Sequence, residues 1–136
     1  GVPTGMGSHK VVQLLEECGS SVVCIDNCTC YKKVLLDMAE EGDALDVLAR
    51  RYLDMHCAVM SPNPHRYSVL RDLARDFAVV DLTWQGCQPY DVESWSVKKF
   101  VREELGLPFL QVVTDYSGAD TEQLKVRLEA FLEMLS

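Results

Sequence analysis

The chain has 136 residues, 48% of them hydrophobic and 25% charged, and a net charge of −8 at pH 7. This length and balance suit one globular domain with a core of its own. The acidic balance argues against nucleic acid as a main partner, because binding to a phosphate backbone needs clustered lysine and arginine. No apolar run approaches the roughly 20 residues of a membrane span, so we expect no membrane partner either.

The chain begins with a glycine-rich stretch, Gly1–Ser8, which predicts a loop. A helix should follow and end at Gly19, because apolar residues recur at helical spacing in Val11, Leu14, Leu15 and Cys18. Ser21–Ile25 is a short, continuous apolar run, the pattern of a strand buried on both faces. Within it, we expect Cys24 to face the sheet packing. Asp26–Lys33 is polar and should be a loop at the carboxyl end of that strand.

The middle of the chain predicts two helices and a second strand. Asp43 can cap a helix whose core-facing stripe should be Leu45, Leu48, Ala49, Tyr52 and Leu53. Ser61–Pro64 is a helix breaker, and the next helix carries Val69, Leu70, Leu73, Ala74 and Phe77. The strand Ala78–Leu82 and a loop, Trp84–Asp91, follow.

The last third repeats the alternation of helix and strand. A helix over Glu93–Leu105 should end at Gly106, and Phe109–Val113 should form the third visible strand. The loop Thr114–Gly118 then leads to a final helix, which Asp120 and Gln123 would open as a capping box.

This alternation predicts an α/β fold with three layers, a parallel sheet of about four strands flanked by helices, as in Rossmann- or flavodoxin-like domains. The glycine-rich start is typical of the exit of a strand, so we expect the first strand to lie before residue 1. Residues 1–136 should therefore form a single α/β domain that belongs to a longer polypeptide.

Six cysteines are many for this length: Cys18, Cys24, Cys28, Cys30, Cys57 and Cys87. A secreted disulfide-rich domain would be loop-rich and poor in core, whereas this chain shows regular periodicity throughout. We therefore expect a reducing cytoplasm, where the thiols are open to metal binding or redox chemistry.

Parallel strands end at one edge of their sheet, so the loops that leave them should converge there. Cys28, Cys30 and Cys87 lie in such loops, whereas Cys18 and Cys57 do not. Thiolates suit zinc or iron–sulfur centres. The spacing alone does not decide for a metal, because no CxxC pair is present, and Cys30 would equally suit a helix start or a buried contact.

The glycine loop permits other readings. Gly5, Gly7 and Ser8 begin like a dinucleotide-binding fingerprint, but Lys10 stands where the third glycine belongs. Asp26 fits the acidic position that binds a ribose in such folds. The alternatives are a nucleotide-binding module, a tight turn that starts a helix, or backbone N–H groups that hold an anion such as a CoA phosphate.

Five other residues have structural interpretations. His9, His56 and His65 are expected to be surface or capping residues rather than catalytic ones. Asp115 and the neighbouring Tyr116 could serve acid–base chemistry or lock their loop by hydrogen bonds, and we favour the lock.

Three stretches, Val22–Lys32, Thr83–Ser94 and Leu107–Glu133, resemble the family of 2-hydroxyacyl-CoA dehydratases (2-hydroxyglutaryl-CoA dehydratase D-component) and benzoyl-CoA reductases. The resemblance is to the C-terminal domain of the family's subunits. Within the family, the branch of double-cubane cluster proteins is similar to this chain. The resemblance implies an oxygen-sensitive iron–sulfur protein of anaerobic metabolism. Family subunits hold a cluster through three cysteines, two from an N-terminal domain and one, which Cys87 matches, from the C-terminal domain.

The resemblance also implies further roles. Cys28 matches a cysteine of the double-cubane branch and is a candidate additional ligand, while Cys30 stands where a glycine is usual. Family members take an electron from an ATP-dependent iron–sulfur activator and form a ketyl radical from an acyl-CoA substrate, using a [4Fe–4S] or double-cubane cluster. The expected partners are that activator and a second dehydratase or reductase subunit, or a homodimer. The chain alone is expected to be inactive.

Overall fold

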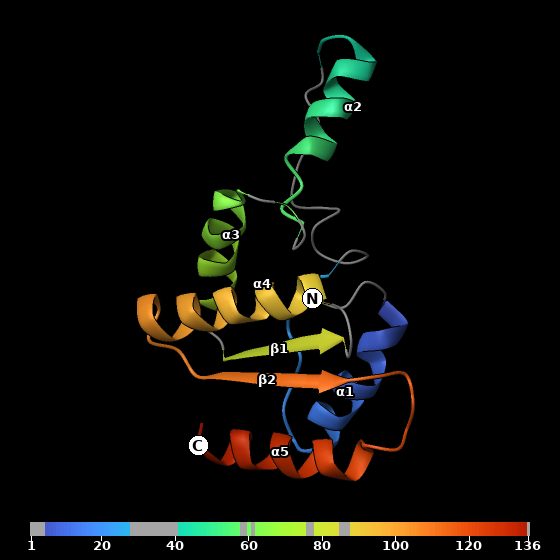
Figure 1. Ribbon diagram of the computed structural model, residues 1–136, viewed down its shortest axis with the longest axis vertical. Coiled ribbons are helices and arrows are strands. Elements are labelled where there is room, and N and C mark those ends of the chain that lie inside the picture. The colour runs from blue at the N-terminus through green and yellow to red at the C-terminus, as the bar shows by residue number, and fades with distance from the viewer. Residues whose placement is uncertain are drawn as a thin grey trace.

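The computed structural model describes residues 5–27, 41–57, 60, 62–75, 78–84 and 88–135. Helices and strands are mixed along these residues, which confirms the α/β class (Figure 1). In chain order the elements are α1 (Gly5–Glu17), α2 (Ala44–Leu53), α3 (Pro64–Ala74), β1 (Val79–Trp84), α4 (Gln88–Lys99), the π-helix η2 (Phe100–Glu104), β2 (Phe109–Thr114) and α5 (Thr121–Glu133).

The two strands of the described residues form a parallel pair. Val79 lies opposite Phe109, and Trp84 lies opposite Thr114. Parallel neighbours need a crossover connection, which α4 and η2 provide. The carboxyl ends of β1 and β2 therefore lie at the same edge of the sheet.

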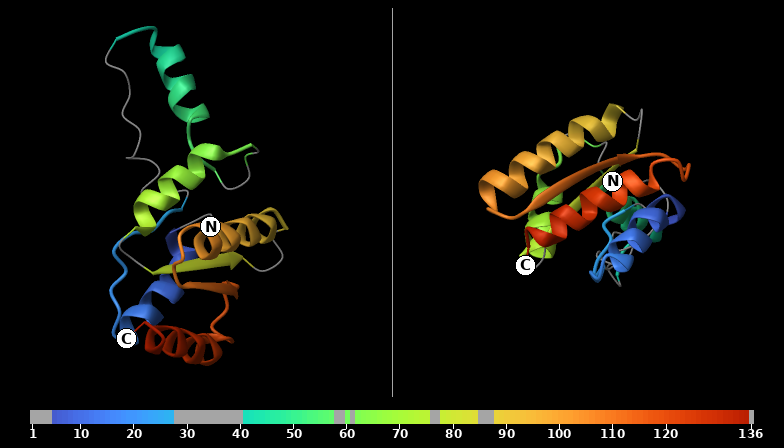
Figure 2. Two further views of the ribbon diagram at one scale, coloured as in Figure 1. Left: turned by 90° about the vertical axis from the view of Figure 1, so that its left-hand side faces the viewer. Right: turned by 90° about the horizontal axis from the view of Figure 1, so that it is seen from below.

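Helices cover both faces of this sheet. Phe109 and Val112 of β2 point to opposite faces, because side chains alternate along a strand. Phe109 packs against α4 and η2, in a core cluster with Val97, Phe100 and Val101. Val112 packs against α1 and α5, in a cluster with Val11, Leu14, Leu15, Leu124 and Leu128. Figure 2 shows α4 on one side of the strands and α1 with α5 on the other.

Three local signals of the sequence are confirmed. Gly19 and Gly106 follow α1 and η2 with φ angles of 87° and 66°, the left-handed conformation that a glycine adopts without a Cβ penalty. The Asp43 side chain accepts hydrogen bonds from the N–H groups of Leu45 and Asp46 at 3.0 and 3.2 Å. It caps α2 as predicted.

Three predictions for the first quarter of the chain are wrong. Residues 5–8 belong to α1 rather than to a loop. Ser21–Ile25 is not a strand. Within it, Val22 packs against the α1–α5 core, but Val23 is exposed, and so is Cys24, which was expected to face the sheet packing. An apolar run alone does not specify a pairing partner, and here it packs without entering the sheet.

The predicted burial of α2 is also wrong. No side chain of α2 is buried, and Leu45 is 76% exposed. Figure 1 and Figure 2 show α2 projecting from the rest of the molecule. The amphipathic pattern predicted the helix correctly, but it does not indicate which part of the protein, if any, the apolar face packs against. None of the described helices is long and apolar enough to cross a bilayer.

Candidate functional site

The two candidate ligands, Cys28 and Cys87, lie outside the described residues. The chain is described up to Asn27 on one side, and up to Trp84 and again from Gln88 on the other. β1 ends at Trp84, two residues after the predicted end at Leu82, and α4 begins directly after Cys87. Tyr90 and Asp91, assigned by the sequence to the loop, belong to α4.

Gly5, Gly7 and Ser8, the candidate cofactor-binding residues, lie in the first turns of α1. Lys10, one turn further along, is engaged within the protein. Its ammonium group donates to the carbonyl oxygens of Asp115 and Ser117 at 3.0 and 2.7 Å. It also pairs with the Asp120 carboxylate at 2.6 Å.

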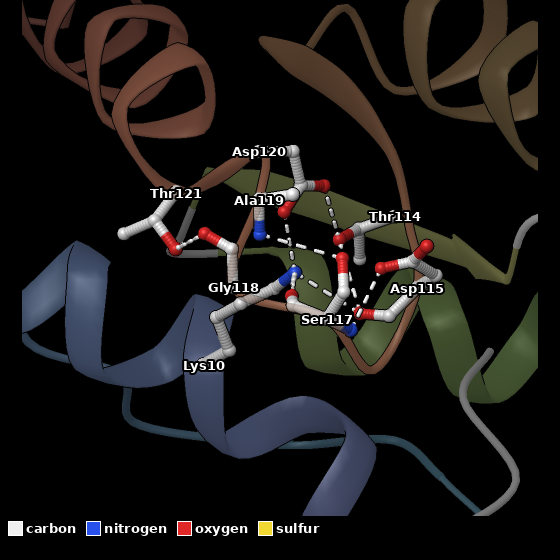
Figure 3. A network of polar contacts seen from close by, with 8 residues as sticks. All are labelled: Lys10, Thr114, Asp115, Ser117, Gly118, Ala119, Asp120 and Thr121. Atoms are coloured by element: carbon white, nitrogen blue, oxygen red, sulfur yellow. Dashed lines mark hydrogen bonds and ion pairs between the residues drawn. The ribbon is translucent and has the colours of Figure 1, made fainter.

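These contacts belong to a lysine network, which we define as Lys10, Thr114, Asp115, Ser117 and Asp120 (Figure 3). The Thr114 hydroxyl donates to Asp120 Oδ2 at 2.6 Å. The Asp115 carboxylate accepts from the Ser117 N–H at 2.8 Å. The network closes the connection between β2 and α5 and joins it to α1. For Asp115, the interpretation as a hydrogen-bonding lock is therefore confirmed.

Asp120 does not cap α5, so the predicted capping box is wrong. Its side chain makes no cap hydrogen bond and instead turns to Lys10 and Thr114. Burial alone would raise the pKa of Asp120, but the hydrogen bonds from Lys10 and Thr114 outweigh it and lower that pKa. The pKa of Asp115 is lowered chiefly by its hydrogen bonds from Ser117.

A second group of polar side chains, the arginine cluster, comprises Asp26, His56, Arg66 and Glu93. Arg66 lies near the start of α3 and is only 3% exposed. Its Nη1 donates to Asp26 Oδ2 at 3.0 Å, and its Nε donates to the Glu93 carboxylate. Burial alone would lower the pKa of Arg66, but the two carboxylates outweigh it and raise that pKa. The guanidinium is therefore a permanent buried charge held between two acids.

His56 was predicted to be a surface or capping residue, but it is buried in the arginine cluster, and Asp54 is the C-cap of α2. His56 is 2% exposed, and its Nε2 lies 3.6 Å from Asp26 Oδ1. The ring of His65 meets that of His56 edge-on, with centroids 5.6 Å apart. His9, by contrast, is exposed in α1 as predicted.

Asp81 and Ser94 form a third buried polar contact. Asp81 lies in the middle of β1, and the Ser94 hydroxyl of α4 donates to its carboxylate. Both residues are buried. Because Ser94 follows Glu93 directly, the second turn of α4 is held at adjacent positions by β1 and by Arg66.

A cavity of about 380 Å³ lies beside the arginine cluster. Its walls are mainly apolar and come from α1, α3, β1, α4, α5 and the segment Ser20–Asn27, with Asp26, Arg66 and Asp81 as charged lining residues. The volume is within the range of small-molecule sites. The segment that leads to Cys28 therefore borders a cavity instead of a neighbouring strand.

The described cysteines give no metal centre by themselves. Cys18 packs against the α1–α5 core, where burial raises the pKa of its thiol and disfavours the thiolate. Cys57 is half-buried and Cys24 is exposed. In the part of the chain that the structure describes, no group of three or more His, Cys, Asp or Glu side chains could hold a metal ion.

Two contacts join segments that neighbour the loops predicted to converge. Lys10 of α1 bonds to the Thr114–Gly118 loop, and Arg66 joins Asp26 to Glu93 of α4. The convergence of the loops themselves stays a prediction, because residues 1–4, 28–33 and 85–87 lie outside the described residues. Sequence reasoning missed Arg66, Glu93, Asp81 and Ser94. The signal that could have found a residue of this kind is a charged side chain inside an otherwise apolar element, such as Asp81 in β1.

The fold and these contacts define the class of protein: an α/β domain with helices on both faces of a parallel sheet, of which the described residues form two strands, and polar clusters that join its connecting segments. The family described as 2-hydroxyglutaryl-CoA dehydratase, D-component, matches residues 1–135. The chain belongs to this family. It is also 41% identical over 138 aligned positions to YjiM of Escherichia coli (strain K12), which carries the provisional name of a dehydratase subunit. That match covers 99% of this chain but 36% of the relative's length.

Proposed function

We propose that this chain is the cluster-binding C-terminal domain of a longer dehydratase-like or acyl-CoA reductase-like subunit. In this proposal Cys87 supplies one ligand to a low-potential iron–sulfur cluster, and Cys28 is an additional ligand. The cluster is of the [4Fe–4S] or double-cubane type. The parent protein dehydrates a 2-hydroxyacyl-CoA, or reduces an acyl-CoA, by radical chemistry.

The observation that carries the proposal is the place of Cys87 in a chain of this family. Cys87 directly precedes α4, between that helix and a strand whose parallel neighbour ends at the same edge of the sheet. In open α/β sheets, ligands bind outside the carboxyl ends of the strands. The family match over residues 1–135 supports the dehydratase class.

The donor chemistry fits an iron–sulfur cluster. Cys28 and Cys87 offer thiolates, the ligands such clusters take, and the arginine cluster ties the segment that leads to Cys28 to the helix that follows Cys87. When bound, the cluster would supply the electron for ketyl formation. The chain's own contribution is to provide thiolates and to fix the backbone on either side of them.

The same proposal extends to the assembly. The chain spans 36% of the length of its Escherichia coli relative, so the remaining ligands would come from another part of the subunit. The partners are a second dehydratase or reductase subunit or a second copy, an ATP-dependent iron–sulfur activator and the acyl-CoA, in the cytoplasm. The complete domain would have a Rossmann- or flavodoxin-like parallel sheet of about four strands.

Anaerobic reconstitution of the full-length protein with iron and sulfide tests the ligand assignment. We expect a brown protein whose iron content and visible absorbance fall in Cys87→Ser and to a smaller extent in Cys28→Ser. Cys18→Ala is the matched control, because Cys18 packs in the α1–α5 core. Full iron content and an unchanged spectrum in Cys87→Ser would remove Cys87 from the ligand set.

The alternative is a nucleotide- or CoA-binding module that carries no cluster. Gly5, Gly7 and Ser8 at the start of α1 support it, since a helix N-terminus attracts a phosphate. The contact between Asp26 and Arg66 weighs against it, because the carboxylate proposed to bind ribose already accepts from a buried guanidinium. Tight NAD binding by a protein that takes up no iron would favour this alternative.

A further inference from the structure

We propose that Arg66 is a positioning residue for the cluster: its guanidinium fixes the segment that leads to Cys28 relative to the helix that follows Cys87. The inference rests on the proposed function above. It adds Arg66, a residue that acts through its side chain from a third element, α3.

The geometry is that of one cation between two carboxylates. Arg66 bonds to Asp26, 40 residues earlier in the chain, through Nη1 at 3.0 Å. Through Nε it bonds to Glu93, 27 residues later. Side-chain exposures of 3%, 13% and 11% for Arg66, Asp26 and Glu93 keep the group largely out of water. The two bonds use different nitrogens of one rigid, planar group, so the guanidinium fixes direction as well as distance.

The two residues that Arg66 joins, Asp26 and Glu93, lie in the chain segments next to the candidate ligands. Asp26 lies two residues before Cys28, at the end of a segment that is outside the sheet and borders the cavity. The bond from Arg66 to Asp26 ties this segment to α3. Glu93 lies in the second turn of α4, the helix that begins directly after Cys87.

Replacing Arg66 should therefore disturb cluster binding in a way that loss of an exposed charge does not. A lysine keeps the charge, but its ammonium is a point charge that cannot reproduce the fork. Partners behind metal ligands typically alter metal affinity about 10- to 100-fold. We expect Arg66→Lys in the full-length, reconstituted protein to release iron to a chelator roughly tenfold faster than wild type. We also expect an altered electron paramagnetic resonance spectrum of the reduced cluster.

Two further variants separate positioning from folding. Arg75→Met removes a charge from the opposite end of α3, where Arg75 is exposed and pairs only with Asp72, one turn earlier, among the contacts described. It should leave the spectrum and the release rate unchanged. The triple variant Asp26→Asn, Arg66→Met, Glu93→Gln removes all three charges together, a change that buried ion groups often tolerate. It should fold, yet it should still release iron faster, because no fork joins the two segments.

The outcomes distinguish this inference from the function on which it rests. If wild type takes up no iron, or Cys87→Ser retains a normal cluster, the ligand assignment fails before Arg66 is tested. If the cluster depends on Cys87 but Arg66→Lys and the triple variant match wild type in spectrum and release rate, Arg66 has no positioning role and the ligand assignment stands. Faster release with a changed spectrum in both variants, and not in Arg75→Met, supports the inference.

Discussion

The ammonium of Lys10 lies 2.6 Å from the Asp120 carboxylate, across 110 residues of chain. The pair joins α1 to the start of α5, the two helices that share one face of the sheet. Because Lys10 also donates to two carbonyl oxygens of the connecting loop, one side chain holds the loop and both helices together.

Lys10→Met should lower the free energy of unfolding by about 1–2 kcal/mol. The methionine keeps most of the apolar stem but leaves the Asp115 and Ser117 carbonyls and the Asp120 carboxylate without their shared donor. Urea titration of the purified protein measures the change. Lys98→Met is the matched control, since Lys98 is exposed on α4. Equal stability of the two variants would show that the network adds nothing.

Asp120 should make the fold less stable in acid. Its pKa is lowered in the folded state by Lys10 and Thr114 against the opposing effect of burial, so the folded state favours the carboxylate. The stabilisation is present above the unfolded pKa of roughly 4 and is lost as the pH falls through the lower, folded pKa. In urea titrations at a series of pH values, the free energy of unfolding should fall as the pH is lowered from roughly 5 to 2.

The same acid dependence should be weaker in Asp120→Asn, which carries no titrating group at this position. Part of the slope should remain, because Ser117 independently lowers the pKa of Asp115. An unchanged slope in Asp120→Asn would assign the acid sensitivity to other carboxylates.

The elements that the sequence predicted best are those whose patterns are local. The spacing of the apolar residues predicts one inner face of α5, made of Leu124, Leu128, Phe131, Leu132 and Leu135. The first three are buried, whereas Leu132 is half-buried and Leu135, beyond the end of the helix, is 39% exposed. Gly106 marked the end of η2 through its positive φ. These features depend on a few neighbouring residues, so a single sequence is enough to find them.

The features that the sequence could not give are pairings between distant residues. Nothing local in Arg66 indicates that it will bond to Asp26, 40 residues away. Asp120 was predicted to be a helix cap because its spacing from Gln123 is that of a capping box. In the structure its carboxylate accepts from Lys10 and makes no cap hydrogen bond. Likewise, the sequence pattern predicted the apolar face of α2, but it could not predict that this face would be exposed.

Ser94→Ala should destabilise the protein by about 1–3 kcal/mol, because it removes the hydroxyl that donates to the buried Asp81 carboxylate. The change sits where α4 meets β1, so we also expect faster amide hydrogen exchange in the first turns of α4. Ser96→Ala is the control, since its hydroxyl bonds only to the carbonyl of Val92 on the same helix among the contacts described. A similar small loss in both variants would contradict the role given to Asp81.

Leu128→Ala should cost about 2–5 kcal/mol, the range for deleting a buried leucine side chain. Leu128 is fully buried between α1, β2 and α5, so its removal opens a cavity that surrounding helices cannot fill without moving. The loss should appear as a lower urea midpoint with an unchanged slope, because the surface exposed on unfolding stays similar. Val126→Ala on the same helix is the control: Val126 is 64% exposed and should change stability by less than about 0.5 kcal/mol. If the two variants were equally stable, the packing of α5 against the sheet would have to be different from the one described.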